Sequence, residues 1–409
     1  MHGTSAADTG SQAAAGVAAA RATPAAPEVS VVMPCLNEAE TVTVCVDKAH
    51  RALAEAGISG EVIVSDNGSS DGSRELAESH GARVVSATKR GYGNALMAGI
   101  EAARGRYIVM GDADDSYDWL ELARFVDKLR QGFDLVQGCR LESGGGTVLQ
   151  GAMPFLHRVW GNPMFSALVK WWFRAPIHDV NCGMRGFSKR HYESLRQTAP
   201  GMEFAVEMVI KSSLRSARIA EVPITLHPDG RLSGQPHLRT FRDGWRTLRF
   251  FLLYSPRWLF LVPGLALIAL GLVGYALALP AVEIFGATLD ANTLLFASLA
   301  IICGYQSVAF AVVAKAYGIS HGLLPADARL ERLNRVLPLE RVLAIAGLAI
   351  VAGLVLLGLA INEWRQVDFG ELDYASTVRL VVPGVTLTAV GFQTVLTGFL
   401  ISVLGMRAP

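Results

Sequence analysis

The sequence reads Arg106-Tyr-Ile-Val-Met-Gly-Asp-Ala-Asp-Asp-Ser-Tyr-Asp118 at the point where an apolar run meets a cluster of carboxylates. Residues 107–110 have the length and the β-branched or aromatic character of a strand covered on both faces, as in a parallel sheet. Open α/β sheets bind ligands at the carboxyl ends of their strands. We therefore expect Asp112, Asp114 and Asp115 to lie at a binding site.

The spacing of Asp112 and Asp114 about the small residue Ala113 suits a divalent cation. Two carboxylates can hold a cation that also takes phosphate oxygens, and oxygen ligands favour Mg²⁺ or Mn²⁺ over zinc. The alternative is a solvated acidic turn that caps a helix beginning near Trp119. Taken alone, the stretch favours neither interpretation.

Composition divides the chain into a soluble part and a membrane part. The 409 residues leave room for two or three domains, and 51% of them are hydrophobic. Charged residues are common before about Arg257 and sparse after it. A net charge of +1 argues against a nucleic-acid-binding protein. The five cysteines are an odd number without a CxxC pair, which indicates reduced thiols in a cytosolic environment.

We expect four successive parts. Residues 1–27 are rich in small residues and Pro, which is typical of a disordered tail. The tail lacks the apolar core of a signal peptide, so we expect the domain after it to stay in the cytoplasm. An α/β domain should occupy residues 28–230, a basic juxtamembrane segment residues 231–258, and a membrane domain residues 259–409.

Strand-like runs alternate with helical patterns in the α/β domain. This alternation predicts a parallel sheet of right-handed crossovers with helices on both faces. Three of the strand ends carry polar, glycine-rich turns, so we expect these turns to converge on one site. The expected strands are 29–33, 61–65, 83–87, 107–110 and 134–138.

Two of these turns each allow a chemical and a structural interpretation. Asp66 at a strand end can accept hydrogen bonds from a nucleobase, or it can belong to an ordinary Asx turn. Gly91 and Gly93 let a backbone approach a ligand closely, and Lys89 or Arg90 can meet a phosphate charge. The sequence has no GxGxxG after the first strand and no GxxxxGK[ST], so neither a dinucleotide fold nor a P-loop is supported.

Seven short motifs stand in order along residues 29–239. They are Pro34-Cys-Leu-Asn-Glu38, Asp66-Asn-Gly-Ser-Ser-Asp-Gly72, Arg90-Gly-Tyr-Gly-Asn-Ala95, Asp112-Ala-Asp114, Gly138-Cys-Arg140, Asp179-Val-Asn-Cys-Gly-Met-Arg-Gly-Phe187, and Glu221-Val-Pro223 with Arg231. The set resembles the family 2 glycosyltransferases of GT-A fold, and among them the polyprenyl-phosphate glycosyltransferases typified by dolichol-phosphate mannose synthase. The resemblance implies a mostly parallel α/β domain that binds a nucleotide-sugar.

The resemblance also implies roles for particular residues. Asp112 and Asp114 would hold Mg²⁺ or Mn²⁺ on the donor diphosphate, and Arg231 would close over that diphosphate. Arg140 and Arg158 would face the acceptor phosphate. The other donor-binding residues would be Pro34, Asn37, Glu38, Asp66, Gly91 and Ala113.

Two positions depart from the family pattern. Asn67 stands where a second Asp is usual, which leaves the base of the nucleotide open. The loop 230–237 lacks the Ser-Lys pair that is often found after its Gly234.

The residues also indicate how the transfer would be assisted. Displacing a nucleoside diphosphate builds negative charge on the leaving group, which a cation at Asp112 and Asp114 and a nearby arginine would offset. A lipid monophosphate has a second pKa of about 6 and needs little general-base help. Asp179 is the best candidate for a supporting carboxylate, and the alternative is an ion pair with Arg185 that braces the loop. We therefore expect Asp114, Asp179 and Arg140 to carry the chemistry.

One further pair of acids, Glu203 and Glu207, lies four residues apart on a helical pattern. One of them could face the site, but a solvated helix face is the favoured interpretation.

The segment from Arg231 to Arg257 has the composition of a helix lying at a membrane surface. It contains six arginines and one acid, Asp243, interleaved with aromatic residues. A basic nucleic-acid-binding face is the alternative, but an apolar stretch follows at once.

Four apolar stretches meet the requirement of roughly 20 residues for a membrane-spanning helix. Buried core helices are the alternative. The linker 315–341 carries five basic residues, whereas 280–292 has two acids and no base and 362–377 has four acids and one arginine. The positive-inside rule then places the linker 315–341, both termini and the soluble domain in the cytoplasm. The expected spans are 259–279, 293–313, 342–361 and 380–404.

We therefore expect a multi-pass enzyme of the cell membrane. It would transfer a sugar, with inversion and a divalent metal, from a nucleotide-sugar to a polyprenyl phosphate at the cytoplasmic leaflet. The alternatives are a processive polysaccharide synthase, whose Gln-x-x-Arg-Trp motif the sequence lacks, and a non-catalytic sugar-lipid binding or flipping protein, against which Asp112 and Asp114 argue. The expected partners are the donor, the lipid acceptor and the bilayer, with no nucleic acid; the oligomeric state stays open.

Overall fold

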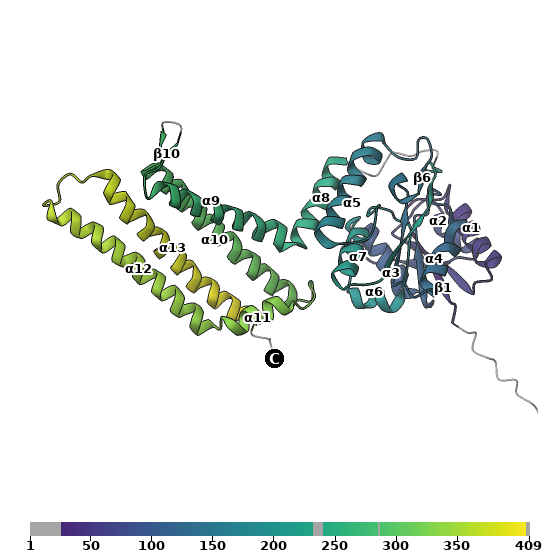
Figure 1. Ribbon diagram of the computed structural model, residues 1–409. Helices are drawn as coiled ribbons and strands as arrows, with labels where there is room; N and C mark the ends of the chain where they lie inside the picture. Colours follow the sequence, from purple (N-terminus) through teal and green to yellow (C-terminus); the bar gives the residue numbers. More distant parts are fainter. Residues whose placement is uncertain (1–25, 232–239, 285–286, 406–409) are drawn as a thin grey trace, which may run out of the picture.

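The structure is a computed structural model that describes residues 26–231, 240–284 and 287–405. An α/β domain lies at one end of the molecule and a bundle of long helices at the other (Figure 1). The tail expected over residues 1–27 and the Gly234 loop lie almost wholly outside the described residues.

A seven-stranded sheet of order β3-β2-β1-β4-β7-β5-β8 forms the centre of the α/β domain. Each pair of neighbours in it is parallel except the two made by β7, which runs antiparallel to β4 and β5. The expectation of a mostly parallel sheet is therefore confirmed. The strands are β1 (Val29–Cys35), β2 (Gly60–Asp66), β3 (Arg83–Ser86), β4 (Tyr107–Met110), β5 (Leu135–Cys139), β7 (Arg185–Ser188) and β8 (Ile219–Pro223).

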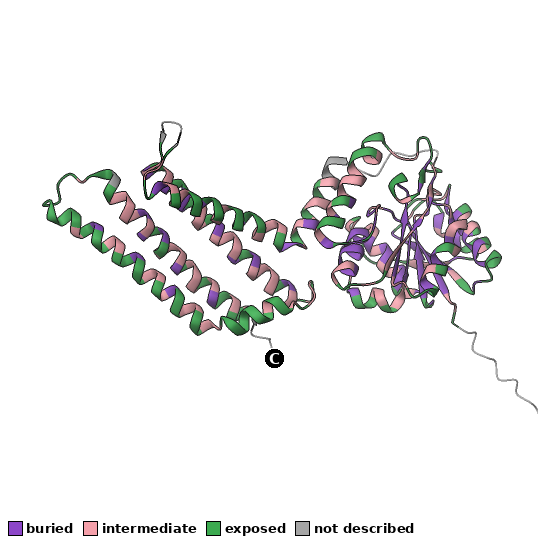
Figure 2. Cartoon of the chain, in the orientation of Figure 1, coloured by how far each residue is buried: buried purple, intermediate pink, exposed green. Residues whose placement is uncertain are grey.

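Helices cover both faces of the sheet, so its central strands are buried (Figure 2). Because side chains alternate along a strand, Val31 and Met33 of β1 join one apolar cluster and Val32 joins the other. The first cluster includes α1 (Val42–Glu55) and α4 (Leu122–Arg130). The second includes α3 (Tyr92–Ala102), α5 (Asn162–Phe173) and α7 (Glu203–Leu214). The helices α2 (Ser73–Ser79) and α6 (Lys189–Leu195) and the short strands β6 (Thr147–Val148) and β9 (Thr225–Leu226) complete the domain.

The basic juxtamembrane segment contains the helix α8 (Thr240–Leu253). Phe251 of α8 is fully buried in the second cluster and meets the ring of Phe165 of α5 edge-on at 5.7 Å. On the same helix, the side chain of Trp245 is 61% exposed. Helix α8 is therefore amphipathic: the face that carries Phe251 packs on the α/β domain, and Trp245 is exposed on the surface.

Glu207 of α7 does not lie on a solvated helix face, so the favoured interpretation of this residue was wrong. Its side chain is fully buried and lies 2.7 Å from Nζ of Lys211. The carboxylate also accepts hydrogen bonds from the backbone N–H groups of Thr198 (3.0 Å) and Ala199 (2.8 Å) and from the hydroxyl of Tyr254 (3.0 Å). This network joins α7, the 198–199 segment and the end of α8.

In the part of the chain that the structure describes, four helices are long and apolar enough to cross a membrane: Arg257–Ala278, Ala291–Ser320, Leu339–Gln366 and Ser376–Leu404. Each includes one of the four expected spans, apart from residue 279, and extends it by several residues. In the bundle α9 packs on α10, and α13 packs on both α10 and α12 (Figure 1). The helices of this part are α9 (Val262–Ala278), α10 (Ala291–Ser320), α11 (Ala328–Val336), α12 (Leu339–Gln366) and α13 (Tyr374–Gly405), with a hairpin of β10 (Glu283–Ile284) and β11 (Ala287–Thr288).

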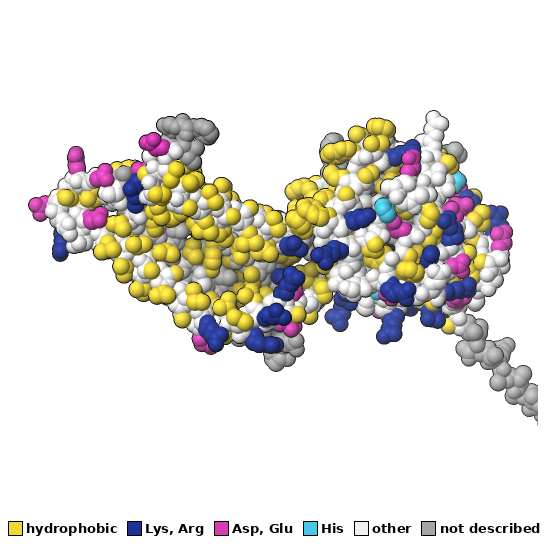
Figure 3. All heavy atoms as spheres, viewed as in Figure 1, with side chains coloured by type: hydrophobic (Ala, Val, Ile, Leu, Met, Phe, Trp, Pro, Cys, Tyr) yellow, Lys and Arg dark blue, Asp and Glu magenta, His cyan; other side chains and the backbone are white. Residues whose placement is uncertain are grey.

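Small residues allow the closest helix contacts in this bundle. A Cβ built on Gly264 of α9 would lie 2.8 Å from the carbonyl oxygen of Gly304 of α10, and one on Gly304 would lie 2.7 Å from that of Gly264. Such close backbone approach is typical of membrane helices, where dispersion contacts replace the hydrophobic effect. The face of the bundle seen in Figure 3 is mostly apolar.

We predict that Lys211→Met destabilises the protein, because the buried Glu207 carboxylate would lose its positive partner. Removing one member of a buried ion pair costs about 3–5 kcal/mol of unfolding free energy. The measurement is the thermal unfolding midpoint of the purified protein, followed by tryptophan fluorescence. Lys170→Met, on the exposed surface of α5, is the control and should leave the midpoint unchanged. Equal midpoints for both variants would contradict the prediction.

Candidate active site

The acidic stretch after β4 lies at the end of the buried strand, as expected. Asp112 accepts a hydrogen bond on Oδ1 from the hydroxyl of Tyr92, at 2.8 Å. Asp114 accepts on Oδ1 from the backbone N–H (3.0 Å) and the hydroxyl (2.6 Å) of Ser116. The third carboxylate, that of Asp115, is instead paired with Lys48 of α1 at 2.7 Å. Asp112 and Asp114 thus remain as the acidic pair of the site.

The side chain of Arg231 lies among the carboxylates that follow β1 and β4. Its Nη1 is 3.2 Å from Oε1 of Glu38, its Nη2 is 3.6 Å from Oδ2 of Asp114, and it also pairs with Asp229. These residues come from three distant parts of the chain. The structure therefore brings together three of the donor-site residues implied by the resemblance.

Burial and nearby negative charge raise the pKa of two of these carboxylates, those of Asp112 and Glu38. Burial raises the pKa of Asp112 to about 7, and the negative charge of Asp114 adds to the effect. Burial also raises the pKa of Glu38 to about 7, against the opposing effect of Arg231. The site therefore concentrates negative charge that an additional cation would stabilise.

The donor set fits a metal ion that arrives with phosphate. Within the described residues, no group of three or more His, Cys, Asp or Glu side chains could hold a metal ion. Mg²⁺ is commonly bound through one or two protein carboxylates, with phosphate oxygens and water completing its octahedral shell. Asp112 and Asp114 supply such a pair, whereas a metal held by protein ligands alone does not fit.

The turn after β2 is held by its own side chains. Asp66 accepts hydrogen bonds from the backbone N–H groups of Gly68 (3.1 Å) and Ser69 (3.0 Å), which is the Asx arrangement. Asn37 adopts a left-handed backbone with φ of 59° and accepts from the backbone N–H of Ser70 at 2.9 Å. Asp66 and Asn37 thus shape the loops after β2 and β1, and their contact with a nucleotide stays a prediction.

Asn67, which departs from the family pattern, connects two of the expected turns. Its Nδ2 donates to the carbonyl oxygen of Lys89 at 2.9 Å, and its Oδ1 accepts from the backbone N–H of Gly91 at 2.7 Å. An ionised Asp could not donate the first of these bonds. The sequence identified Asn67 only as a departure from the family pattern. The two hydrogen bonds form because β2 and β3 are paired in parallel, so the segments that follow these strands lie side by side.

The glycines of the Gly91 turn are needed by the chain itself, and their approach to a ligand stays a prediction. A Cβ at Gly91 would collide with the carbonyl oxygen of Pro200, and a Cβ at Gly93 with that of Ala199. Gly91 also has a φ of 131°, which L-residues rarely adopt. The close approach at this turn is therefore made by the 199–200 backbone.

Arg140 and Asp179 form a buried bidentate ion pair, so the alternative considered for Asp179, an ion pair with Arg185, is wrong. Nε and Nη2 of Arg140 lie 2.7 and 2.8 Å from the two carboxylate oxygens, and its backbone N–H donates at 3.1 Å. Burial works against the charged guanidinium, but Asp179 holds the pKa of Arg140 well above its ordinary value. Arg185 instead donates to the carbonyl oxygens of Ala205 and Cys182.

A histidine beside this pair was missed by the sequence reasoning. Nδ1 of His178 lies 2.6 Å from Oε2 of Glu221, and the backbone N–H of His178 donates to Oε1 at 2.5 Å. The only signals in the sequence were that His178 precedes Asp179 and that Glu221 opens the last motif. Glu221 therefore fixes the orientation of a half-exposed imidazole next to the buried pair.

Arg158 lies apart from the buried pair, on an exposed turn just before α5. It pairs with Glu142, which follows Arg140 by two residues. Its neighbours Phe155, Leu156 and Trp160 have side chains that are 75%, 67% and 69% exposed. Arg158 is thus tied to the segment that carries Arg140 and is surrounded by apolar surface.

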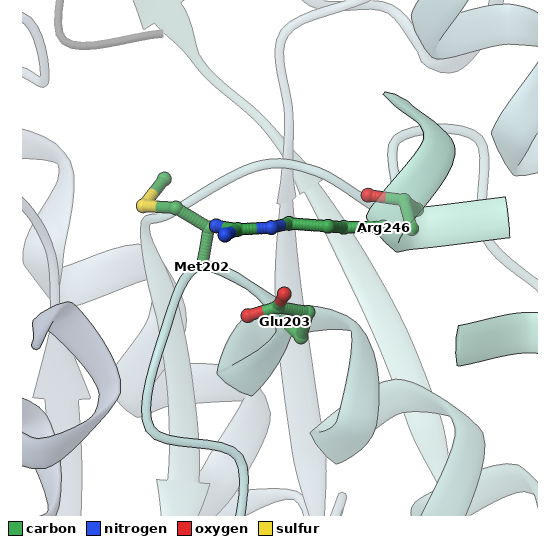
Figure 4. A pocket seen from close by; sticks show the side chains of 4 residues that line it. Met202, Glu203 and Arg246 are labelled. Carbon is green, nitrogen blue, oxygen red and sulfur yellow. The ribbon is translucent and has the colours of Figure 1, made fainter. Parts of the chain in front are cut away.

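Glu203 of α7 lies away from the acidic pair, at a hollow between α7 and α8. Figure 4 shows its carboxylate beside the guanidinium of Arg246, which reaches across from α8 toward Met202. These residues border a small hollow of about 40 Å³ between α7 and α8. Neither of the two acids considered on α7 therefore lies among the carboxylates after β4.

Comparisons with known proteins agree with this fold. The model of glycosyl transferase family 2 matches residues 30–196, and that of the glycosyltransferase family 2 C-terminal transmembrane region matches residues 312–405. The low-salt glycan biosynthesis hexosyltransferase Agl6 of Haloferax volcanii is 36% identical over 93% of this chain and 90% of its own. The dolichyl-phosphate hexose transferase of the same organism is 31% identical over 53% of this chain and 89% of its own.

Among solved structures, glucosyl-3-phosphoglycerate synthase from Mycobacterium tuberculosis is 24% identical, with a TM-score of 0.45 over 55% of this chain and 79% of that one. The mostly parallel α/β sheet with helices on both faces is of GT-A type. This chain belongs to glycosyltransferase family 2, and it is a membrane protein with glycosyltransferase activity.

We predict that Glu38→Gln removes a pH dependence of stability. The folded pKa of Glu38 is about 7 and its ordinary value 4.5, so its contribution is complete below pH 4.5 and is lost as the pH rises through 7. In the wild type this loss should amount to about 3 kcal/mol by pH 8. Denaturant unfolding at pH 5 and pH 8, without added metal, measures it.

Glu78→Gln, on the exposed surface of α2, is the matched control for Glu38→Gln and should keep the wild-type slope. A slope that is the same in both variants would contradict the raised pKa of Glu38.

Proposed function

We propose that this glycosyltransferase moves a sugar from a nucleotide-sugar to a polyprenyl phosphate at the cytoplasmic leaflet, with inversion and with a divalent metal. The observation that carries the proposal is the meeting of Asp112, Asp114, Glu38 and Arg231 at strand ends of a domain joined to four apolar helices. Two relatives, one named as a hexosyltransferase and one as a dolichyl-phosphate hexose transferase, support the same reaction.

On the donor side, Asp112 and Asp114 would hold Mg²⁺ or Mn²⁺ against the diphosphate, where the ion would offset charge on the leaving group. Arg231 already lies beside Asp114 and can contact the same phosphates. The loops shaped by Pro34, Asn37, Asp66 and Gly91 would hold the nucleoside. These residues bind and orient the donor, and none of them needs to form a covalent bond to the sugar.

On the acceptor side, Arg140 would bind the lipid phosphate, and Asp179 would hold its guanidinium in place. Because Nε and one N–H of Nη2 donate to Asp179, the phosphate would be met by the remaining N–H groups on Nη1 and Nη2. Attack by that phosphate on the anomeric carbon in one displacement inverts its configuration. Positioning by arginines then matters more than a general base, because the phosphate is already mostly deprotonated at pH 7.

The surface around Arg158 supports a lipid as the acceptor. Phe155, Leu156 and Trp160 expose apolar area beside this arginine, and Trp245 of α8 does the same on the juxtamembrane helix. Aromatic and basic side chains together are typical of a membrane interface. The basic residues of 315–341 and the acidic loops 280–292 and 362–377 favour a cytoplasmic catalytic domain.

A transfer assay tests the proposal. Purified protein in detergent is incubated with a panel of radiolabelled nucleotide-sugars, polyprenyl phosphate, and Mn²⁺ or Mg²⁺, with and without chelator. One labelled lipid product that disappears on chelation is expected. A long polymer would support a processive synthase instead, and nucleotide binding without any product would support a non-catalytic binding protein.

Asp114→Asn is predicted to lower the turnover rate about 100-fold or more, because it removes charge that offsets the leaving diphosphate. The variant should keep its circular dichroism spectrum and unfolding midpoint. Asp127→Asn, on the exposed surface of α4, is the control and should keep full activity. Full activity of Asp114→Asn would remove the metal role from this residue.

Arg158→Ala is predicted to raise the KM for the lipid acceptor about tenfold, since a hydrogen bond to a charged group is worth about 1.5–3 kcal/mol. The KM for the nucleotide-sugar should stay unchanged. Initial-rate measurements with each substrate varied in turn give both values, and Arg190→Ala on α6 is the control. Equal rises in both KM values would exclude an acceptor role for Arg158.

A further inference from the structure

The membrane part contains a cavity of about 760 Å³, far from the carboxylates after β4. Side chains of α10, α12 and α13 form its walls, among them Val308, Ile345 and Ile401, and α11 closes one end. Because α10 and α12 both pack on α13, the cavity is a groove along α13 between these two helices. Its lining runs from Val390 to Ser402 of α13, which is about 18 Å along a helix axis.

The groove is lined mostly by apolar side chains, and Asn334 and Ser402 add polar groups at the end near α11. Away from α11, the hydroxyls of Tyr305 and Thr394 bond to each other at 2.5 Å, and Thr394 also donates to the carbonyl oxygen of Val390 at 2.7 Å. Their polar groups are thus satisfied within the protein. Asn334 of α11 and Ser402 lie at the α11 end and line the same groove. This gradient matches an amphiphile with its polar part at α11.

Positive charge surrounds the polar end. Four arginines, Arg329, Arg332, Arg335 and Arg341, are exposed on α11 and at the start of α12, against two acids in the same segment, Glu331 and Glu340. None of the four arginines forms an ion pair with another described residue. Figure 3 shows Lys and Arg side chains gathered in the region of α11. Nη1 of Arg341 donates to the carbonyl oxygen of Val336 at 2.9 Å, which ties the end of α11 to the start of α12.

We propose that this groove is a binding site for an anionic phospholipid of the surrounding membrane. One hydrocarbon chain lies along α13, the ester region lies at Asn334 and Ser402, and the phosphate lies among the arginines of α11. The length of the groove agrees with the half-thickness of a bilayer core, about 15 Å. This site is separate from the sugar-transfer site, so the inference does not rest on the proposed function.

Native mass spectrometry of the purified full-length protein tests the head-group preference. The delipidated protein is titrated with phosphatidylglycerol or phosphatidylcholine that carry the same acyl chains. We expect preferential retention of phosphatidylglycerol. The double variant Arg332→Gln, Arg335→Gln should lose about fivefold in phosphatidylglycerol affinity per arginine, since each basic residue near an anionic lipid contributes about 1 kcal/mol. Arg365→Gln, at the other end of α12, is the control.

A second pair of variants tests the groove itself. Ala349→Phe places a ring into the lining and should reduce the binding of both lipids, whereas Ala352→Phe, on the exposed surface of the same helix, should not. Sugar-transfer activity of Ala349→Phe reports that the protein has folded. Equal binding of both lipids by wild type, or unchanged phosphatidylglycerol binding by Ala349→Phe, would overturn the proposal. A change from dimer to monomer in Ala349→Phe without loss of lipid would assign the groove to a second copy of the chain.

Discussion

Negative charge gathered at the ends of β1 and β4 is the constraint around which the catalytic domain is built. Glu38 follows β1, and Asp112 and Asp114 follow β4; these strands are adjacent and parallel, so their ends meet at one edge of the sheet. Within the described residues, Arg231 reaches two of these three carboxylates. These three carboxylates have only one arginine close to them among the described residues, which supports the proposal that they bind a cation together with the donor diphosphate. Such preorganisation lowers the reorganisation that accompanies charge movement during transfer.

The loops around this charge are held by contacts within the protein. Asn67 ties the turn after β2 to Gly91, and Gly91 and Gly93 lie against the 199–200 backbone. That segment donates in turn to the buried Glu207, which also accepts from Tyr254 at the end of α8. A continuous set of packed groups therefore connects the membrane-proximal helix with the donor side of the sheet. On the acceptor side, Asp179 orients Arg140 from a fully buried position, which makes it a positioning residue for that guanidinium.

The chain has two separate surfaces that suit a lipid, one beside the α/β domain and one within the bundle of long helices. Helices α5 and α8 present aromatic and basic side chains at the border of the α/β domain, whereas α10 to α13 enclose a long apolar groove with arginines at one end. The first surface suits a lipid that must meet a phosphate-binding arginine. The second suits a lipid that stays in the bilayer. Glycine contacts between α9 and α10 and between α12 and α13 allow the close packing that shapes this groove.

Local sequence was enough to predict the mostly parallel sheet, the acidic pair Asp112 and Asp114, and the four apolar helices, because these depend on periodicity and on runs of a few residues. The partners of buried charges could not be read in this way. Asp179 pairs with Arg140, 39 positions earlier in the chain. Glu207 accepts a hydrogen bond from the hydroxyl of Tyr254, 47 positions later. A charged residue looks alike in sequence whether it faces solvent or a buried guanidinium, since the cost of its burial is offset by groups that only the folded chain brings near. The same holds for Asn67, His178 and the groove beside α11, whose contacts arise where distant segments meet.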